Sequence, residues 1–381
     1  MPNIHPIHLW DINDKTELNN DAYLHILPKL MPPHGLRGIS LFTGAGGMDI
    51  GFSCAGIRIV VANELTSYAC DTYATNHPDT ILLRGDIRNY STIFSEGDAD
   101  IIFGGPPCQG FSVAGKMNPN DERSQLIWTF LDVVERVRPY VFVMENVKAL
   151  GVLEKWKHIR ESYLERASNI GYCCNYFILN AANFGVSQNR ERVFFIGSRI
   201  PYSSIAFEVV LEKYKEKAKT LRELFLTVPP AGSEENPLTC SAKISLAAKP
   251  VMRRSPYAGM LFNGMGRPLN LDTVSTTLPA SMGGNKTPII DINLLSNPSA
   301  HDWVRDYHAK LWKGTGEAYF AAAPEQLRRL TIVESAAIQS FPANYKFCGT
   351  KSAIYTQIGN AVPCKLAEGV AKSVINFFFE E

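Results

Sequence analysis

The sequence predicts an α/β fold built on a doubly wound, parallel sheet, together with a smaller and irregular region. Short apolar runs alternate with helical stretches between residues 37 and 200, a glycine-rich turn follows the first run, and the alternation stops near Pro201. Strands that alternate with helices are joined by crossovers, and a crossover returns the chain parallel to the preceding strand.

The expected elements follow one another in regular order through the first half of the chain. The first strand is the apolar run 39–42, and a helix at 48–55 follows it. Short apolar runs of this kind are typical of strands that are buried on both faces. Further strands are expected at 57–62, 81–83, 101–103, 140–144, 174–179 and 192–196, with helices at 67–76 and 126–137.

The second half of the chain has a different character. A charged helix is expected at 208–219, and residues 229–288 are rich in Pro, Gly, Ser and Asn without a clear period. Such a stretch predicts loops and short strands. Helices are again expected at 332–339 and 363–377. We therefore divide the chain into an extension, 1–36, a sheet domain, 37–201 with 328–381, and a second domain, 202–327.

Composition excludes several classes of protein. The 381 residues are 45% hydrophobic and 20% charged with a net charge of +1, which is typical of a globular chain without an overall basic field. The eight cysteines form no Cys-x-x-Cys pair, so we expect neither a structural metal nor a disulfide scaffold. No apolar run approaches a membrane span, and the first residues lack a signal peptide's core, so we expect a soluble protein inside the cell.

Cys108 lies in the most informative segment, Gly-Gly-Pro-Pro-Cys-Gln-Gly-Phe-Ser at 104–112, directly after the strand expected at 101–103. Proline fixes the backbone and glycine permits close approaches, so the thiol is held on a rigid loop. Most free cysteines are small buried hydrophobic residues. A cysteine at the end of a strand in an open α/β sheet, in this frame, instead favours a nucleophile.

Three strand ends together suggest a site for one adenosyl ligand. The turn 43–47 does not fit Gly-x-Gly-x-x-Gly, because Asp49 stands three residues past Gly46, and alone it is equally well explained as a tight turn. Glu64 ends the second strand, where an acidic side chain can accept hydrogen bonds from ribose hydroxyls. Asp86 follows the third strand, where it could accept from an adenine amine.

Charged residues also follow the later strands. Glu145 ends the strand next to that of Cys108, and a carboxyl group shielded from water can hold a proton near neutrality and act as an acid. Arg190 and Arg192, two residues apart on a strand, would share a face and suit carbonyl or phosphate oxygens. The alternative for this pair is a surface salt bridge with Glu191.

Together with two later segments, 329–342 and 357–363, these elements follow one another along the chain in an order that resembles a DNA cytosine-5 methyltransferase of the bacterial restriction-modification type. The resemblance spans residues 37–375 and implies a Rossmann-like S-adenosylmethionine-dependent methyltransferase domain with a smaller target-recognition domain at 202–327. The elements that carry it are Phe42–Gly47, Glu64, Gly85-Asp86, Pro106-Pro107-Cys108-Gln109, Glu145-Asn146-Val147, Gln188-x-Arg190-x-Arg192, Arg329–Pro342 and Gln357–Pro363.

The resemblance also implies roles for single residues. Cys108 would be the nucleophile, Glu145 would hold N3 and the amino group of a cytosine, and Arg192 would contact its O2 with Arg190 beside it. The residues that would line the site of S-adenosylmethionine, and of the product S-adenosylhomocysteine, are Phe42, Gly44, Ala45, Gly46, Gly47, Glu64, Asp86, Ile87, Pro106, Asn360 and Val362.

The partner implied by the resemblance is double-stranded DNA, with a cognate restriction endonuclease acting separately. We expect a monomer in the bacterial cytoplasm, at the nucleoid when bound to DNA. The residues expected at the DNA are Gln109 and Ser112 on a closing loop, and Arg253, Arg254, Arg267, Thr277 and Lys286 in the second domain.

Other interpretations are weighed against this one. Related enzymes that act on transfer RNA carry a Cys-Phe-Thr element, which residues 347–350, Phe-Cys-Gly-Thr, do not reproduce. A catalytically inactive DNA-binding relative or regulatory subunit would have lost Cys108, Glu145 or Arg192. All three residues are present, which disfavours this interpretation. The glycine spacing disfavours a dinucleotide oxidoreductase.

The chain departs from the family pattern at three positions. Val333 and Ala337 stand where further arginines are usual, which bears on the packing of the two domains rather than on the chemistry. Cys364 stands where a second proline is common.

Overall fold

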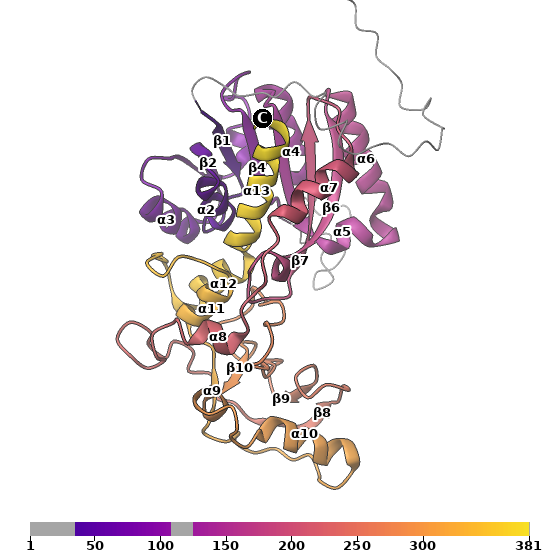
Figure 1. Cartoon of the computed structure of the whole chain (residues 1–381). Helices are drawn as coiled ribbons and strands as arrows, with labels where there is room; N and C mark the ends of the chain where they lie inside the picture. Colours follow the sequence, from indigo (N-terminus) through magenta and orange to yellow (C-terminus); the bar gives the residue numbers. More distant parts are fainter. Residues whose placement is uncertain (1–34, 108–124, 381) are drawn as a thin grey trace, which may run out of the picture.

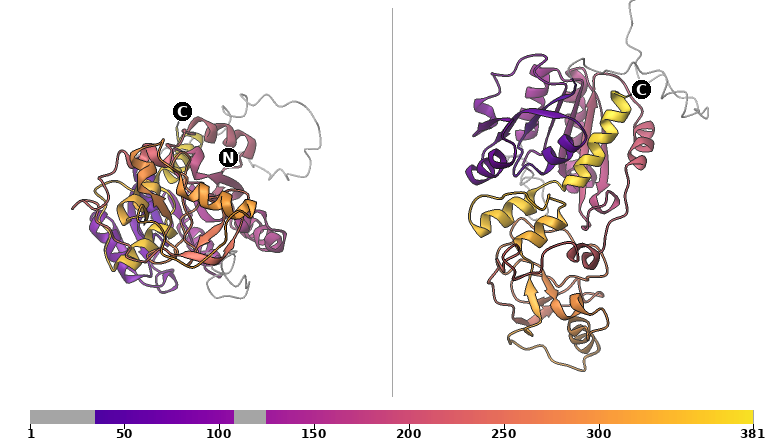
Figure 2. Two further views of the ribbon diagram at one scale, coloured as in Figure 1. Left: turned by 90° about the horizontal axis from the view of Figure 1, so that it is seen from below. Right: turned by 60° about the vertical axis from the view of Figure 1, so that its left-hand side comes forward.

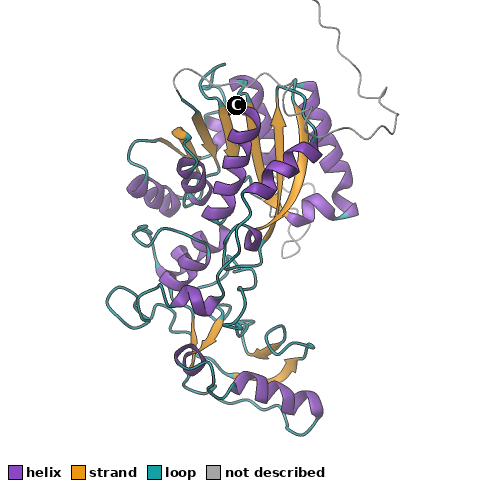
Figure 3. Cartoon of the chain, in the orientation of Figure 1, coloured by secondary structure: helices purple, strands orange, loops and turns teal. Residues whose placement is uncertain are grey.

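The computed structural model describes residues 35–107 and 125–380, which fold into two lobes (Figure 1). The upper lobe contains a large sheet with helices on both of its faces. The lower lobe is built mostly of loops around short helices and strands (Figure 3). Within the described residues, no helix is both long and apolar enough to cross a membrane.

The upper lobe is organised by a seven-stranded sheet of order β3-β2-β1-β4-β5-β7-β6. Strands β1 to β5 pair in parallel. Their carboxyl ends therefore meet at one edge of the sheet, which is where sites form in open α/β folds. The strands are β1 (Arg37–Leu41), β2 (Arg58–Glu64), β3 (Ile81–Arg84), β4 (Ile101–Gly104), β5 (Val141–Val147), β6 (Cys173–Asn180) and β7 (Glu191–Ser198).

The expectation of a fully parallel sheet was wrong for one strand. β7 runs antiparallel to both of its neighbours, β5 and β6. Only residues 181–190 join β6 to β7, and the helical part of this connection is a single turn, Ala181–Asn183. A parallel return needs a longer crossover, whereas an antiparallel one needs only a short loop.

Two apolar cores cover the faces of the sheet. Ile101 and Phe103 point into one core and Ile102 into the other, as the two-residue period of a strand requires. The first core is completed by α2 (Gly47–Cys54), α7 (Ser204–Lys213) and α13 (Cys364–Phe378). The second is completed by α4 (Leu126–Val137) and α6 (Lys157–Asn169), while α3 (Ser67–Asn76) lies beside β2 and β3 and α5 (Lys148–Val152) precedes α6.

The C-terminal helix α13 returns to the sheet, as expected. It leaves the lower lobe and runs along the sheet beside α2 (Figures 1 and 2). A Cβ at Gly51 of α2 would lie only 2.4 Å from the backbone nitrogen of Glu368, so glycine is what lets the two helices approach.

The lower lobe has its own cores. One joins α8 and residues 269–282 to α11 and α12, and the other lies under α10. The elements of this lobe are α8 (Leu221–Phe225), β8 (Leu246–Val251), β9 (Met260–Phe262), β10 (Ile289–Asp291), α9 (Ile292–Ser296), α10 (Trp303–Lys313), β11 (Leu327–Arg329), α11 (Ile332–Ile338) and α12 (Lys351–Asn360).

At two points, an apolar core extends across the expected domain limits. α7 follows residue 201 but packs into the core of the sheet, and α11 and α12 follow residue 328 but share a core with α8. The functional division into 1–36, 37–201 with 328–381, and 202–327 stays a prediction.

The charged helix expected at 208–219 is shorter and begins earlier. α7 spans Ser204–Lys213 and ends at the C-cap Tyr214. The backbone of Glu216 instead exchanges hydrogen bonds with Asn183 and Gly185, both of 2.9 Å. This non-local pairing overrides the helical preference of the lysines and glutamates.

Candidate active site

The carboxyl edge of the sheet gathers most of the residues that the sequence singled out. In the parallel register Leu41 is paired with both Asn63 and Gly104, and Gly104 with Met144. The segments that follow β1, β2, β4 and β5 therefore emerge side by side. These segments carry the glycine turn and the Pro-Pro loop, and the ends of β2 and β5 beside them carry Glu64 and Glu145.

Glu145 is buried at this edge and paired with Arg192. The glutamate is 8% exposed, and its Oε1 lies 2.8 Å from Nε of Arg192. Glu145 and Arg192 are diagonal neighbours on β5 and β7, because Val147 is the residue directly opposite Arg192. Burial raises the pKa of Glu145, and the charges of Arg192 and Arg190 oppose that rise. The carboxyl group is thus placed to hold or donate a proton while remaining hydrogen-bonded.

Arg190 and Arg192 do not share the same partners. Arg192 faces Glu145, whereas the guanidinium of Arg190 donates to the carbonyls of Leu278, at 3.3 Å, and Gly359, at 2.9 Å. Arg190 precedes β7 rather than lying on it, and it is 2% exposed. Its contacts join the edge of the sheet to the lower lobe. The alternative of a surface pair with Glu191 does not describe it, since Glu191 binds Lys148 at 2.7 Å.

The loop before Cys108 is held by close backbone contacts. A Cβ at Gly104 would lie 2.1 Å from the carbonyl oxygen of Leu41, and one at Gly105 would lie 3.0 Å from Oε2 of Glu145. The amide of Asn146 donates to the carbonyl of Pro106 at 3.2 Å. The first part of the loop is therefore fixed against Glu145. Cys108, Gln109 and Ser112 themselves lie outside the described residues.

The glycine turn has the backbone of a ligand-binding loop. Phe42, Gly44 and Gly46 have φ of 57°, 58° and 80°. A positive φ at a phenylalanine is uncommon and marks a strained position. A Cβ at Gly44 would meet nothing within 4 Å, so this glycine borders open space.

Glu64 and Asp86 occupy the neighbouring strand ends. Glu64 accepts from the backbone N–H of Gly44 at 2.8 Å and from that of Thr66 at 2.7 Å. A carboxylate has about four lone-pair sites, so capacity remains for ligand hydroxyls. Asp86 accepts from the N–H of Arg88 and pairs with its guanidinium, which lowers the pKa of the aspartate. The side chain of Ile87 is 2% exposed and packs into the core.

The C-terminal turn meets the glycine turn from the other side. A Cβ at Gly47 would lie 2.5 Å from the carbonyl oxygen of Val362. Asn360 ends α12 and is exposed, whereas Val362 is buried. Two segments more than 300 residues apart in sequence are thus in contact at one site.

The sequence interpretation missed two residues at this edge. Leu65 directly follows Glu64 and is 67% exposed, which presents an apolar surface beside the carboxylate. Asn63 is buried and donates to the carbonyls of Leu83 and Gly85 at 3.0 and 2.9 Å, which ties the ends of β2 and β3 together. Leu65 could have been found from the sequence, because an apolar residue directly follows the acidic residue that ends the strand.

The five residues expected at the DNA in the second domain lie on the surface of the lower lobe or at its junction. Thr277 donates to the carbonyl of Asn189 at 2.7 Å, next to Arg190. Arg267 and Lys286 are exposed on adjoining loops. A hydrogen bond of 2.9 Å from the N–H of Gly266 to the carbonyl of Asn285 joins these loops. Arg253 and Arg254 are exposed elsewhere in this lobe.

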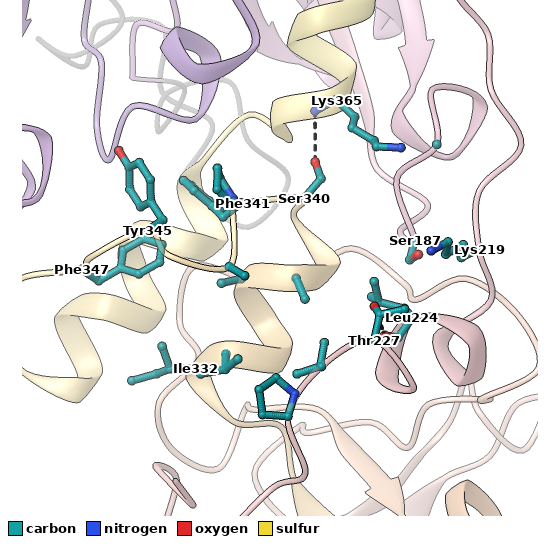
Figure 4. A pocket seen from close by; sticks show the side chains of 18 of the residues that line it. Ser187, Lys219, Leu224, Thr227, Ile332, Ser340, Phe341, Tyr345, Phe347 and Lys365 are labelled. Atoms are coloured by element: carbon teal, nitrogen blue, oxygen red, sulfur yellow. Dashed lines mark hydrogen bonds between the residues drawn. The ribbon is translucent and has the colours of Figure 1, made fainter. Parts of the chain in front are cut away.

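A pocket of about 370 Å³ lies between residues 216–229, which include α8, and α11 with the segment that follows it (Figure 4). Val333 and Ala337, the two positions where arginines are usual, are among its lining residues. Small side chains at these positions therefore leave space between the lobes. In the ranges that the structure describes, no group of three or more His, Cys, Asp or Glu could hold a metal ion.

The fold and this edge define a methyltransferase-type α/β enzyme. The family model described as C-5 cytosine-specific DNA methylase matches residues 36–376, so the chain belongs to this family of DNA cytosine-5 methyltransferases.

Sequence relatives agree with that assignment. The chain is 32% identical to the Type II methyltransferase M1.HphI of Haemophilus parahaemolyticus, over 89% of this chain and 87% of the relative. It is also 32% identical to M.NgoPII of Neisseria gonorrhoeae, over 89% and 95% of the two chains.

Solved structures share the fold. A putative DNA modification methyltransferase from an E. coli prophage superposes with a TM-score of 0.60 at 21% identity, covering 90% of this chain and 99% of the other. The S. pombe Dnmt2 methyltransferase gives 0.58 at 18% identity, covering 90% and 98%.

Proposed function

We propose that the chain transfers a methyl group from S-adenosylmethionine to C5 of one cytosine in a short double-stranded DNA sequence, through a covalent bond between Cys108 and C6. The observation that carries this proposal is the buried pair of Glu145 and Arg192, held against the Pro-Pro loop whose next residue is Cys108.

The residues at the strand ends fit an adenosyl cofactor. Open space beside Gly44, the carboxylate of Glu64 and the exposed Leu65 would take the sugar and the base, with Asp86 and Asn360 at the rim. When bound, the cofactor supplies an electrophilic methyl group on a sulfonium. A positive φ at Gly44 and Gly46 lets the backbone approach such a ligand closely.

The position of Glu145 supports base flipping. The residue is 8% exposed, so its carboxyl group would be shielded from a base that stays stacked in a duplex. Enzymes that act on ring atoms of a paired base take that base out of the stack. Glu145 would then hold N3 and the amino group, and Arg192 would hold O2.

The chemistry follows from the electron demand of the ring. The Cys108 thiolate would add to C6 while the Glu145 carboxyl group protonates N3, so that C5 becomes an enamine carbon. C5 would then take the methyl group from the sulfonium, whose S–CH3 bond breaks to leave the neutral thioether S-adenosylhomocysteine. Loss of the C5 proton to a base then re-forms the C5–C6 double bond, expels the thiolate and returns the N3 proton. This is covalent catalysis, in which one difficult step becomes several easier ones.

The biological setting is part of the proposal. The relatives named above are Type II methyltransferases, which supports a modification enzyme that works with a separate endonuclease of the same specificity. We propose that it acts as a monomer on DNA in the cytoplasm.

The test is base-resolution methylation sequencing of unmethylated genomic DNA after incubation with the protein and S-adenosylmethionine. The proposal predicts 5-methylcytosine in one short recurring sequence, and none with Cys108→Ala. Methylation of transfer RNA without methylation of DNA would overturn the proposed substrate.

A further inference from the structure

A buried polar cluster lies beneath the glycine turn and has no role in the chemistry described above. Asp49, on the first turn of α2, is fully buried. Its carboxylate accepts from the hydroxyl of Thr43 at 2.5 Å and from that of Tyr73 at 2.9 Å. A buried carboxylate is retained only where donors satisfy it. Here one donor belongs to the glycine turn and the other to α3.

His77 and Tyr345 extend the cluster to the C-terminal part of the chain. The ring of His77 stacks on Tyr73 with centroids 4.3 Å apart, and its Nε2 lies 3.2 Å from the hydroxyl of Tyr345. The hydroxyl of Tyr345 also donates to the carbonyl of Ala45. The glycine turn is therefore hydrogen-bonded at Thr43 and at Ala45 by side chains from elements far apart in sequence.

The cluster fills the space directly under Gly46. A Cβ at Gly46 would lie 2.8 Å from both Nε2 of His77 and the hydroxyl of Tyr345. The positive φ at Phe42 is unfavourable for a residue with a side chain, so the conformation of the turn needs support from its surroundings.

Tyr345 connects the turn to the segment that follows α11. Figure 4 shows its ring beside Phe347 and Phe341 at the end of the pocket, with the hydroxyl turned away from the pocket towards the indigo, N-terminal part of the chain. Phe341, Tyr345 and Phe347 contact one another edge to face or tilted, with centroids 5.1 to 5.3 Å apart. This aromatic group anchors the ring whose hydroxyl holds Ala45.

We propose that Tyr345, together with Asp49, Tyr73 and His77, is a set of positioning residues that holds the glycine turn in the conformation that binds the methyl donor. The proposal rests on the proposed use of S-adenosylmethionine. It adds that affinity for the donor depends on the hydroxyl of Tyr345, a group that itself touches neither the donor nor DNA in this account.

The test compares Tyr345→Phe with a matched control, Tyr355→Phe. Tyr355 is also a hydrogen-bonded tyrosine, but its hydroxyl contacts the carbonyl of Leu330, at 2.6 Å, and the hydroxyl of Thr239, at 2.8 Å, rather than the turn. Each variant loses one hydroxyl and keeps its ring. The measurements are the KM for S-adenosylmethionine, kcat, the Kd for S-adenosylhomocysteine by calorimetry, the Kd for a DNA duplex, and Tm.

Tyr345→Phe should raise the KM for S-adenosylmethionine and the Kd for S-adenosylhomocysteine by about 3- to 10-fold, the range for one hydrogen bond. Its kcat and DNA affinity should change less than about 2-fold, since the fold and the catalytic pair are retained. Tyr355→Phe should lower Tm by as much as Tyr345→Phe does. It should leave the KM for the donor unchanged. Asp49→Asn, which keeps the volume but weakens acceptance from Thr43, should raise the KM further.

Two results would overturn the inference while leaving the proposed function intact. One is an unchanged KM for the donor in Tyr345→Phe, and the other is an equal rise in both tyrosine variants, which would indicate general destabilisation. A wild-type protein that binds neither S-adenosylmethionine nor S-adenosylhomocysteine would overturn the inference and the proposed cofactor together.

Discussion

At the scale of single residues, the account depends on the environment of Glu145. Its burial raises its pKa, while Arg192 at 2.8 Å keeps the carboxyl group oriented. Glu191, on the same edge of β7, is exposed and bound to Lys148 instead. The two glutamates, on neighbouring strands of one sheet, therefore have opposite environments, and they allow a matched comparison.

Replacing Glu145 with Gln should reduce kcat by about 10²-fold or more, the usual contribution of a positioned acid. The amide keeps the shape and still hydrogen-bonds, but it cannot deliver a proton to N3. Steady-state methyl transfer to duplex DNA measures this effect, with Glu191→Gln as the control that should retain activity. Equal activity of Glu145→Gln and wild type would remove Glu145 from the mechanism.

The raised pKa of Glu145 also predicts a pH dependence of stability. A carboxyl group whose pKa is higher in the folded state binds its proton more tightly there, so its favourable contribution is complete below its unfolded value, near 4.5. That contribution is lost as pH rises through the folded pKa. The Tm of Glu145→Gln minus that of wild type should therefore increase as pH rises above about 4.5. Calorimetry across this range would contradict the assigned direction if the difference fell.

At the scale of elements, the Pro-Pro loop is positioned by two glycines with different constraints. Gly104 lies on β4 against the backbone of Leu41, while Gly105 faces the carboxyl group of Glu145. A backbone neighbour cannot move without disturbing the sheet, whereas a side chain can shift by a few tenths of an ångström. The two positions therefore separate the stability of the strand from the geometry of the site.

Gly104→Ala should destabilise the fold by about 3 kcal/mol or more, because the added methyl group overlaps the carbonyl of Leu41. Gly105→Ala should change the free energy of unfolding by only about 1 kcal/mol but lower kcat, since the methyl group displaces Glu145. Urea denaturation together with single-turnover methyl transfer distinguishes the two. The opposite ranking of the two stabilities would contradict the described contacts.

The sequence predicted the elements that depend on local pattern and missed those that depend on distant partners. The strands at 39–42, 101–103 and 140–144 were anticipated because apolar runs and glycine turns are local signals. The reversed direction of β7 and the early end of α7 depend on pairing between segments, as at Glu216 with Gly185. Single sequence patterns carry no signal for such pairing.

The same limit applies to the site. Glu145 and Arg192 were each expected to contact the cytosine, but the ion pair between them was not predicted. The destination of Arg190, at the carbonyls of Leu278 and Gly359, could not be predicted, because it depends on how the lower lobe folds back. The roles of these residues in catalysis and binding stay predictions.

At the scale of the whole molecule, buried amides join the two lobes. Gln188 is fully buried, donates to Oε1 of Gln339 at 2.8 Å and accepts from the N–H of Leu278 at 2.8 Å. Gln339 in turn donates to the carbonyl of Ile358 at 2.6 Å. The edge of the sheet, Leu278 and α12 thus share one chain of hydrogen bonds, which fixes how the lower lobe faces the active-site edge.

A double-mutant cycle of Gln188→Ala and Gln339→Ala should show the coupling across this junction. Each single change should cost about 1–3 kcal/mol, because buried partners are left unsatisfied. The double variant should cost less than the sum by about 0.5–1.5 kcal/mol, the net value of their shared hydrogen bond. Chemical denaturation provides the free energies. Simple additivity would mean that the two amides act independently.

The measurement that tests the central claim most directly is mass spectrometry of the protein after incubation with S-adenosylmethionine and a DNA duplex carrying 5-fluorocytosine at the target position. Fluorine at C5 cannot leave as the proton does, so the bond between Cys108 and C6 should persist. The account predicts a stable adduct whose mass equals the protein plus the methylated strand, mapped to the peptide containing Cys108 and absent in Cys108→Ala. An adduct on another residue, or methyl transfer to unsubstituted DNA without any adduct here, would contradict it.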